Sequence, residues 1–201
     1  MKRSMILGLM VLLLCAAGGV AQSSGEGNDI RKVDFLNFSY PSSLCSQEYG
    51  EDGIGKVVSV RDGEFKNESV YFAFAGDTIV YADMTGDGRE EAVVPIDCGA
   101  IGANFSRSEV YVYTIQGGSP TLLAELGDDD LERDYRLHYP DAESYWGVKD
   151  NGLKVKDGRL EVDVLAEGPH ASPRYIVTLE YRLGGEALGL IGKPQRKRVG
   201  R

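Results

Sequence analysis

Short runs of β-branched and aromatic residues, separated by glycine-containing turns, constrain the fold of this chain more than any other feature. Such runs favour strands, and the dipeptides between them supply the positive φ angles that tight hairpins require. The dipeptides are Asp62-Gly63, Gly76-Asp77, Gly117-Gly118, Asp157-Gly158 and Gly184-Gly185. The predicted strands span residues 56–61, 70–75, 78–83, 91–96, 110–114, 121–126, 152–156, 159–165, 174–182 and 187–191. The pattern therefore predicts antiparallel meanders.

One segment is predicted to be helical. The three acids Asp128, Asp129 and Asp130 precede Leu131, and acids in the first turn interact favourably with the positive end of a helix dipole. The helix should end before Pro140, because proline cannot continue it. Many short strands with one short helix predict an all-β fold, which is an antiparallel sandwich or a partly closed barrel.

The first 21 residues have the three parts of a secretory signal peptide. Residues 1–3 are positively charged at Lys2 and Arg3, residues 5–17 are apolar, and residues 19–21 form a small-residue cleavage site. A membrane-spanning helix needs about 20 apolar residues, and the apolar run at residues 5–17 is shorter than that. No transmembrane span is expected in the mature chain. The predicted organisation is a signal peptide at 1–21, a flexible leader at 22–32, one β-rich domain at 33–192 and a basic tail at 193–201. The protein is expected to be secreted or periplasmic.

The mature chain is strongly acidic. Without Lys2 and Arg3 it has 20 basic and 31 acidic residues, and five of the basic residues lie in the tail. The body therefore has a net charge of −16, which repels phosphate backbones and attracts cations. Nucleic acid is not expected as a partner, and residues 193–201 are expected to be a frayed, solvated end.

Two cysteines, Cys45 and Cys98, remain after Cys15 is removed with the signal peptide. An oxidising compartment favours a disulfide, for which only one pairing is possible. The alternatives are two unpaired buried thiols or a zinc site with His138 and His170, which lack ligand spacing to the cysteines.

Residues 83–91 carry oxygen donors at alternate positions. A loop that coils around a hard cation presents every second residue inward, and Gly86 and Gly88 permit the tight turn. The alternative is a glycine-rich turn whose acids bond nearby amides. The candidate calcium ligands are Asp83, Thr85, Asp87, the carbonyl of Arg89, and Glu91.

The sequence Asp83-Met84-Thr85-Gly86-Asp87-Gly88-Arg89-Glu90-Glu91 resembles the calcium loops of FG-GAP repeats. These loops occur in integrin-type propeller blades and in related bacterial exported proteins. The resemblance implies calcium and the five ligands named above. Thr85 stands where the family has Asn or Asp, and Glu91 stands where it has Asp. A propeller needs several blades, whereas this loop occurs once, so a propeller fold is not expected.

Two histidines are candidates for catalysis. His170 lies two residues before Ser172 in a proline-bounded segment, and His138 precedes Tyr139. A turn explains the first pair without catalysis. A hydrolase acting on envelope polymers would need His170 or His138 to meet nearby carboxylates such as Asp141 or Glu143.

The sequence predicts an exported, calcium-stabilised, β-rich binding protein whose envelope or extracellular partner it does not identify. The alternative is the hydrolase just described. Neither prediction implies an oligomeric state.

The signal peptide predicts that the mature chain begins at Gln22. Amino-terminal sequencing of the protein purified from its native host should find this residue first. Ala21→Arg is the control, because a large charged residue beside the cleavage site should block processing. A lipid-modified chain beginning at Cys15 would contradict the prediction.

Overall fold

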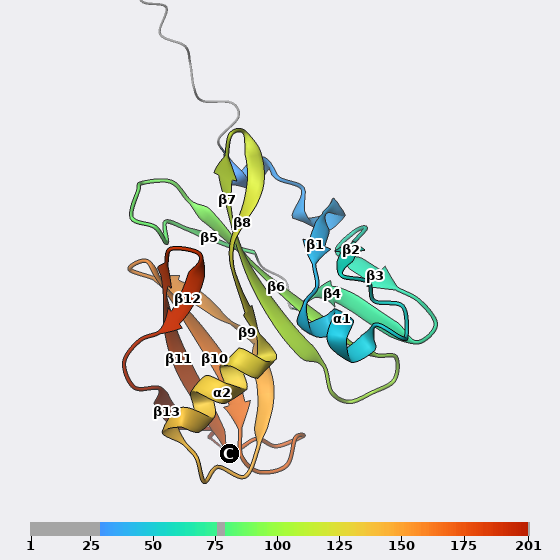
Figure 1. The fold of residues 1–201 in the computed structure, drawn as a ribbon. Coiled ribbons are helices and arrows are strands. Elements are labelled where there is room, and N and C mark those ends of the chain that lie inside the picture. The colour runs from blue at the N-terminus through green and yellow to red at the C-terminus, as the bar shows by residue number, and fades with distance from the viewer. Residues whose placement is uncertain (1–28, 76–78, 201) are drawn as a thin grey trace, which may run out of the picture.

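The largest of three antiparallel sheets in the described residues, here called the central sheet, has the strand order β3-β4-β6-β7-β8, and β5 also pairs with β6. The computed structural model describes residues 29–75 and 79–200 (Figure 1). The predicted signal peptide, the Gly76-Asp77 turn and Thr78 lie outside these residues. The strands of the central sheet are β3 (Glu64–Lys66), β4 (Val70–Phe74), β5 (Val80–Ala82), β6 (Glu91–Ala100), β7 (Arg107–Gln116) and β8 (Ser119–Gly127).

The second sheet, here called the C-terminal sheet, has the order β12-β11-β10-β9, with β13 paired to β11. Its strands are β9 (Tyr145–Lys156), β10 (Arg159–Ala166), β11 (Tyr175–Gly184), β12 (Ala187–Leu190) and β13 (Gln195–Arg198). The N-terminal layer precedes both sheets. It consists of the 3-10 helices η1 (Ile30–Lys32) and η2 (Phe35–Asn37), strand β1 (Ser39–Pro41), helix α1 (Leu44–Tyr49) and strand β2 (Val57–Ser59).

Strands β6 and β7 of the central sheet are buried on both faces. Figure 1 shows the N-terminal layer on one side of β6 and β7 and the C-terminal sheet on the other. Successive side chains of a strand point to opposite faces. Val94 and Ile96 therefore pack in a core with the N-terminal layer, whereas Val93 packs in a second core with the C-terminal sheet. This double burial explains the nearly continuous apolar run of β6.

The C-terminal sheet has one buried face. In β10, Leu160, Val162 and Val164 are fully buried, while Glu161 and Asp163 between them face outward. Asp157 and Gly158 have φ angles of 52° and 68° and join β9 to β10, which confirms the predicted hairpin. Helix α2 (Asp128–His138) packs on this sheet and ends before Pro140, as predicted.

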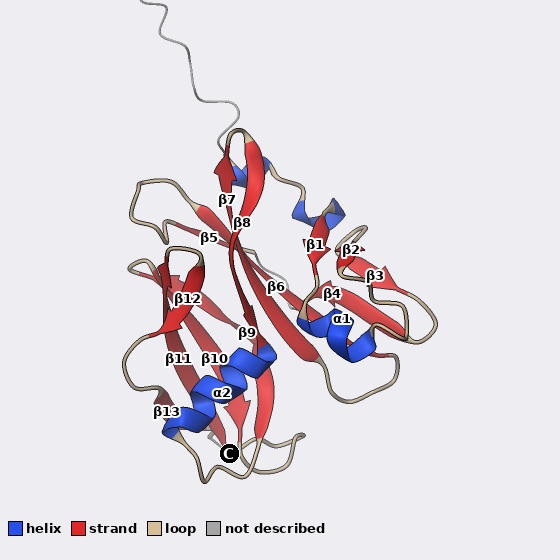
Figure 2. Cartoon of the chain, in the orientation of Figure 1, coloured by secondary structure: helices blue, strands red, loops and turns tan. Residues whose placement is uncertain are grey.

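The predicted all-β class is confirmed, with an antiparallel, sandwich-like arrangement (Figure 2). Among the described residues, α2 is the one helix longer than two turns. No helix in that part of the chain combines the length and apolar character needed to cross a membrane.

The acids at the start of α2 are used within the protein itself. Asp128 is fully buried, accepts a hydrogen bond from the Tyr145 hydroxyl at 2.5 Å and lies 3.5 Å from the Arg107 guanidinium. Asp130 accepts the amide hydrogen of Gly127 at 3.4 Å, which caps the helix. Internal partners therefore account for both carboxylates.

Two ends of the domain differ from the predictions. The fold begins before residue 33, because Ile30 is 2% exposed and Arg31 pairs with Glu90 at 2.5 Å. The expectation of a frayed basic tail is wrong for Gln195–Arg198, which pair with β11 as strand β13. Arg196 holds this strand by stacking 3.6 Å from the Tyr175 ring centre.

The predicted disulfide is present. Cys45 in α1 and Cys98 in β6 are bonded, with Cα atoms 6.1 Å apart. Both residues are fully buried. Because α1 has six residues, this bond and the core beneath it fix the N-terminal layer to the central sheet.

Loss of this bond should destabilise the fold. Cross-linking residues 53 positions apart stabilises a protein by about 4 kcal/mol according to chain-entropy arguments. The double variant Cys45→Ala/Cys98→Ala should therefore have a lower free energy of unfolding by about that amount in urea denaturation. Reductant should destabilise the wild type and leave the variant unchanged. Two reactive thiols in unreduced, denatured wild type would contradict the bond.

Candidate functional site

The predicted calcium loop joins β5 to β6 and lies against the β9–β10 turn. Met84 anchors the loop, because its side chain is 4% exposed and belongs to the second core. A Cβ atom at Gly158 would lie 3.5 Å from the carbonyl oxygen of Asp83 and 3.8 Å from that of Met84. The loop of one sheet therefore packs on the turn of the other.

The exposed part of the loop is held by its own carboxylates. Asp83 accepts amide hydrogens from Gly86 at 2.6 Å and from Gly88 at 2.9 Å. The Thr85 hydroxyl lies 3.5 Å from the same carboxylate. Asp87 bonds both the amide and the guanidinium of Arg89 at 2.9 Å, and the bonded guanidinium lowers the pKa of Asp87.

Glu91 differs from these acids because its side chain is fully buried. Its carboxylate accepts amide hydrogens from Met84 at 2.8 Å and Thr85 at 3.3 Å, and a hydroxyl hydrogen from Thr114 at 3.2 Å. Burial raises the pKa of Glu91, and these three hydrogen bonds oppose the rise. Among the described residues Glu91 forms no ion pair. Glu91 is therefore a buried carboxylate that no described Lys, Arg or His side chain neutralises.

The chemistry of the loop suits a hard cation, since its donors are carboxylate and hydroxyl oxygens. Gly86 and Gly88 have φ angles of 78° and 83°, which permit the tight turn. A bound ion would compete with Arg89 for the Asp87 carboxylate. In the described part of the chain, no three acidic, histidine or cysteine side chains lie in a metal-holding arrangement. Calcium ligation by Asp83, Thr85, Asp87, Arg89 and Glu91 stays a prediction.

The two histidines lie in structural surroundings. His170 packs edge-on against Trp146, with ring centres 5.1 Å apart. The amide of Ser172 donates to the carbonyl of Pro169 at 2.8 Å, as a turn requires. His138 is the last residue of α2. Within residues 29–75 and 79–200, neither histidine forms a hydrogen bond or ion pair with a carboxylate.

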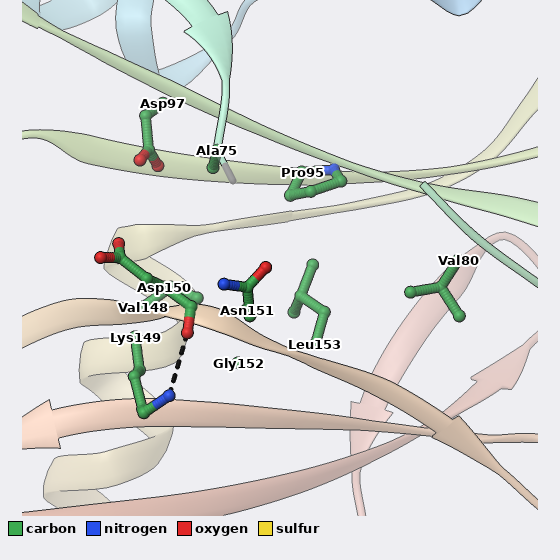
Figure 3. Close-up of a pocket in the computed structure, with 10 residues that line it drawn as sticks. All are labelled: Ala75, Val80, Pro95, Asp97, Val148, Lys149, Asp150, Asn151, Gly152 and Leu153. Atoms are coloured by element: carbon green, nitrogen blue, oxygen red, sulfur yellow. Dashed lines mark hydrogen bonds between the residues drawn. The ribbon is translucent and has the colours of Figure 1, made fainter. Parts of the chain in front are cut away.

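A pocket of about 240 Å³ lies between the central sheet and β9. Figure 3 shows two carboxylates at one end of it and aliphatic side chains toward the other. The sequence did not single out these residues as a site. They are Ala75, Val80, Pro95, Asp97, Val148, Lys149, Asp150, Asn151, Gly152 and Leu153.

Asp97 is an acid of this pocket whose pKa is shifted. Burial raises its pKa from the ordinary 3.8 to about 6, a hydrogen bond from Ser108 at 2.7 Å opposes the rise, and the charge of Asp150 adds to it. Asp97 forms no ion pair among the described residues. Perturbed acids in clefts are candidates for function.

A bulge in β9 forms the other wall. Val162 and Val164 of β10 pair with Leu153 and Val148, so the four residues 149–152 of β9 lie opposite the single residue Asp163 of β10. Asn151 has a φ of 53°, and a Cβ atom at Gly152 would lie 2.6 Å from the carbonyl oxygen of Lys149. Bulges often redirect side chains beside functional sites. The Asp150-Asn151-Gly152 sequence was the available signal, but it was interpreted as the turn-like start of the predicted strand 152–156.

No protein-family model, no curated protein and no solved structure matches the chain. The functional assignment therefore depends on the geometry described above.

The raised pKa of Asp97 predicts a pH-dependent cost. Because its folded pKa of about 6 exceeds the ordinary 3.8, the folded state binds more protons than the unfolded state between these values. The free energy of unfolding should therefore fall as pH rises from about 4 to about 6. Asp97→Asn should remove this fall and be more stable at pH 7 by up to about 3 kcal/mol.

Urea denaturation of wild type and Asp97→Asn at several pH values measures this difference. Asp128, whose pKa is also raised to about 6, titrates in both proteins. The Asp97 charge contributes to that rise, so Asp97→Asn also moves the pKa of Asp128 toward its ordinary value. Glu186→Gln is the control, because it removes an exposed charge at the β11–β12 turn. If the free energies of unfolding of wild type and Asp97→Asn differed by the same amount at pH 4 and at pH 7, the raised pKa of Asp97 would be contradicted.

Proposed function

We propose that this chain is an exported, non-enzymatic binding protein whose fold is stabilised by calcium at residues 83–91. The observation that supports calcium best is the fully buried Glu91 carboxylate, which has no ion-pair partner among the described residues. A buried charge is costly unless an opposite charge compensates it. A cation held by the same loop would provide that compensation.

Two further features support a cation at this loop. Asp83 and Asp87 lie in the same short segment as Glu91, and Asp87 already raises the pKa of Glu91 through its charge. The body of the chain has a net charge of −16, which concentrates cations near its surface. Calcium would also hold β5 and β6 in place where the loop contacts the β9–β10 turn.

Export is supported by the signal-like residues 1–21 and by the disulfide, since disulfides persist in oxidising compartments. The cell envelope or the medium is the proposed location. The binding role is favoured over the hydrolase because no observation brings His138 or His170 to a carboxylate. The partner is an envelope or extracellular molecule and not a nucleic acid, because the acidic body repels phosphates.

Calcium should raise the thermal midpoint of the protein. A ligand that binds only the folded state stabilises it by about 2.7 kcal/mol at a hundredfold excess over its dissociation constant. Wild type should therefore melt at a higher temperature in millimolar calcium than in chelator, and Asp87→Ala should lose the difference. Asp141→Ala, which removes an exposed acid outside the loop, should keep it.

Magnesium distinguishes ligation from charge screening, since it prefers smaller, stricter octahedral sites. Equal melting of wild type in chelator and in calcium would refute the calcium proposal. An equal shift in magnesium would show only screening and would also refute it.

A further inference from the structure

We propose that the pocket between β6 and the β9 bulge binds an alkylammonium group, which is a protonated primary amine on a short aliphatic stem. This inference rests on the proposed binding function and is independent of the calcium loop. It assigns the pocket residues Asp97 and Asp150 to the ammonium and the aliphatic wall to the stem.

The charged end of the pocket suits a cation. Asp97 accepts one side-chain hydrogen bond, from Ser108 to Oδ1, and its Oδ2 accepts none among the described residues. Asp150 is exposed on the bulge and close enough for its charge to act on Asp97. An ammonium has three donors, which the oxygens of two carboxylates can accept.

The remainder of the pocket selects the kind of cation. The aliphatic side chains of Val80, Pro95, Val148 and Leu153 line it, and Figure 3 shows Pro95, Leu153 and Val80 away from the carboxylates. No described lining residue is aromatic, so the pocket lacks the stacking surface that planar ligands and sugars use. Two carboxylates exclude anionic ligands.

Lys149 is the one cationic residue in the lining, and its ammonium is already bonded. It donates to the main-chain carbonyl of Asp150 at 3.0 Å. Figure 3 shows this bond on the side of the Asp150 backbone opposite to Asp97. Within the described residues it forms no ion pair with either pocket acid. The carboxylate end is therefore left for a ligand.

The energetics of Asp97 agree with this role. A carboxylate whose burial raises its pKa is held at a cost to the folded protein. A bound ammonium would offset that cost, because an opposite charge within about 4–6 Å favours the ionised form. A residue that only stabilised the fold would be served better by an uncharged side chain.

The test is a titration of the mature protein with n-butylamine at pH 7.5, followed by amide shifts in NMR spectra. Saturable shifts should appear at residues 96–97 and 148–153. Methylamine should bind more weakly, with each methylene tightening binding about fourfold. The isosteric n-butanol and the anion butyrate should bind at least tenfold more weakly, because they lack the charge-assisted hydrogen bonds.

Asp97→Asn should weaken butylamine binding by roughly tenfold or more, and Asp150→Asn should weaken it less because that residue is exposed. Glu186→Gln removes the same charge outside the pocket and should leave the affinity unchanged. Equal binding of butanol and butylamine, or equal affinity in wild type and Asp97→Asn, would overturn the proposal. So would an absence of saturable shifts at the pocket.

Two additional ligands distinguish the source of the amine. A free diamine and a lysine capped at both ends present the same ammonium. Tighter binding of the diamine identifies a small metabolite-like amine as the ligand, and tighter binding of the capped lysine identifies a peptide side chain. Titrations in chelator and in calcium separate the two proposals. Failure of the calcium proposal appears as unchanged melting and leaves the amine titration intact.

Discussion

The burial of β6 and β7 on both faces is the constraint on which the rest of the structure depends. A strand with two buried faces has no solvent for its polar side chains, so each one needs an internal partner. Three carboxylates on these strands meet that requirement differently. Glu91 binds the amides of Met84 and Thr85, and Glu109 accepts the amides of Leu44 at 2.7 Å and Cys45 at 3.0 Å.

These bonds turn buried acids into anchors for neighbouring segments. Glu91 fixes the start of the loop, and Glu109 fixes the first turn of α1, which the disulfide also holds. Asp97 is the exception among the three, because within the described residues it accepts a hydrogen bond from the Ser108 hydroxyl and from no backbone amide. Glu91 and Glu109 are therefore structural acids, whereas Asp97 faces the pocket.

The sequence predicted what is encoded locally. The Asp157-Gly158 hairpin and the start of α2 follow from adjacent residues, and the structure has both. Helix α1 was missed because its amides are bonded by Glu109, which lies more than 60 positions away. Strand β13 was missed because its polar sequence resembles a solvated end, whereas pairing with β11 and the stacking of Arg196 on Tyr175 order it.

The same distinction separates the two candidate sites. The predicted calcium loop is contiguous, so its alternating oxygens were visible in residues 83–91. The pocket was not visible, because β5, β6, β9 and the residue that follows β4 each contribute to its wall. Asp97 stood within an apolar run and Asp150 in a turn-like segment, and the fold places them at one cavity, with Asp150 on the bulge of β9.

The two sites would also sort cations by hydration. A calcium ion needs six to eight oxygen ligands, which an exposed loop with nearby water can complete. In the pocket the same ion would face Pro95 and Leu153, which cannot replace its hydration shell. An alkylammonium loses less free energy of hydration on entering the pocket. Its stem is stabilised by contact with those aliphatic groups, and its three hydrogens bond carboxylates. The acidic body attracts both ions, so the aliphatic wall, and not the net charge, decides which cation the pocket retains.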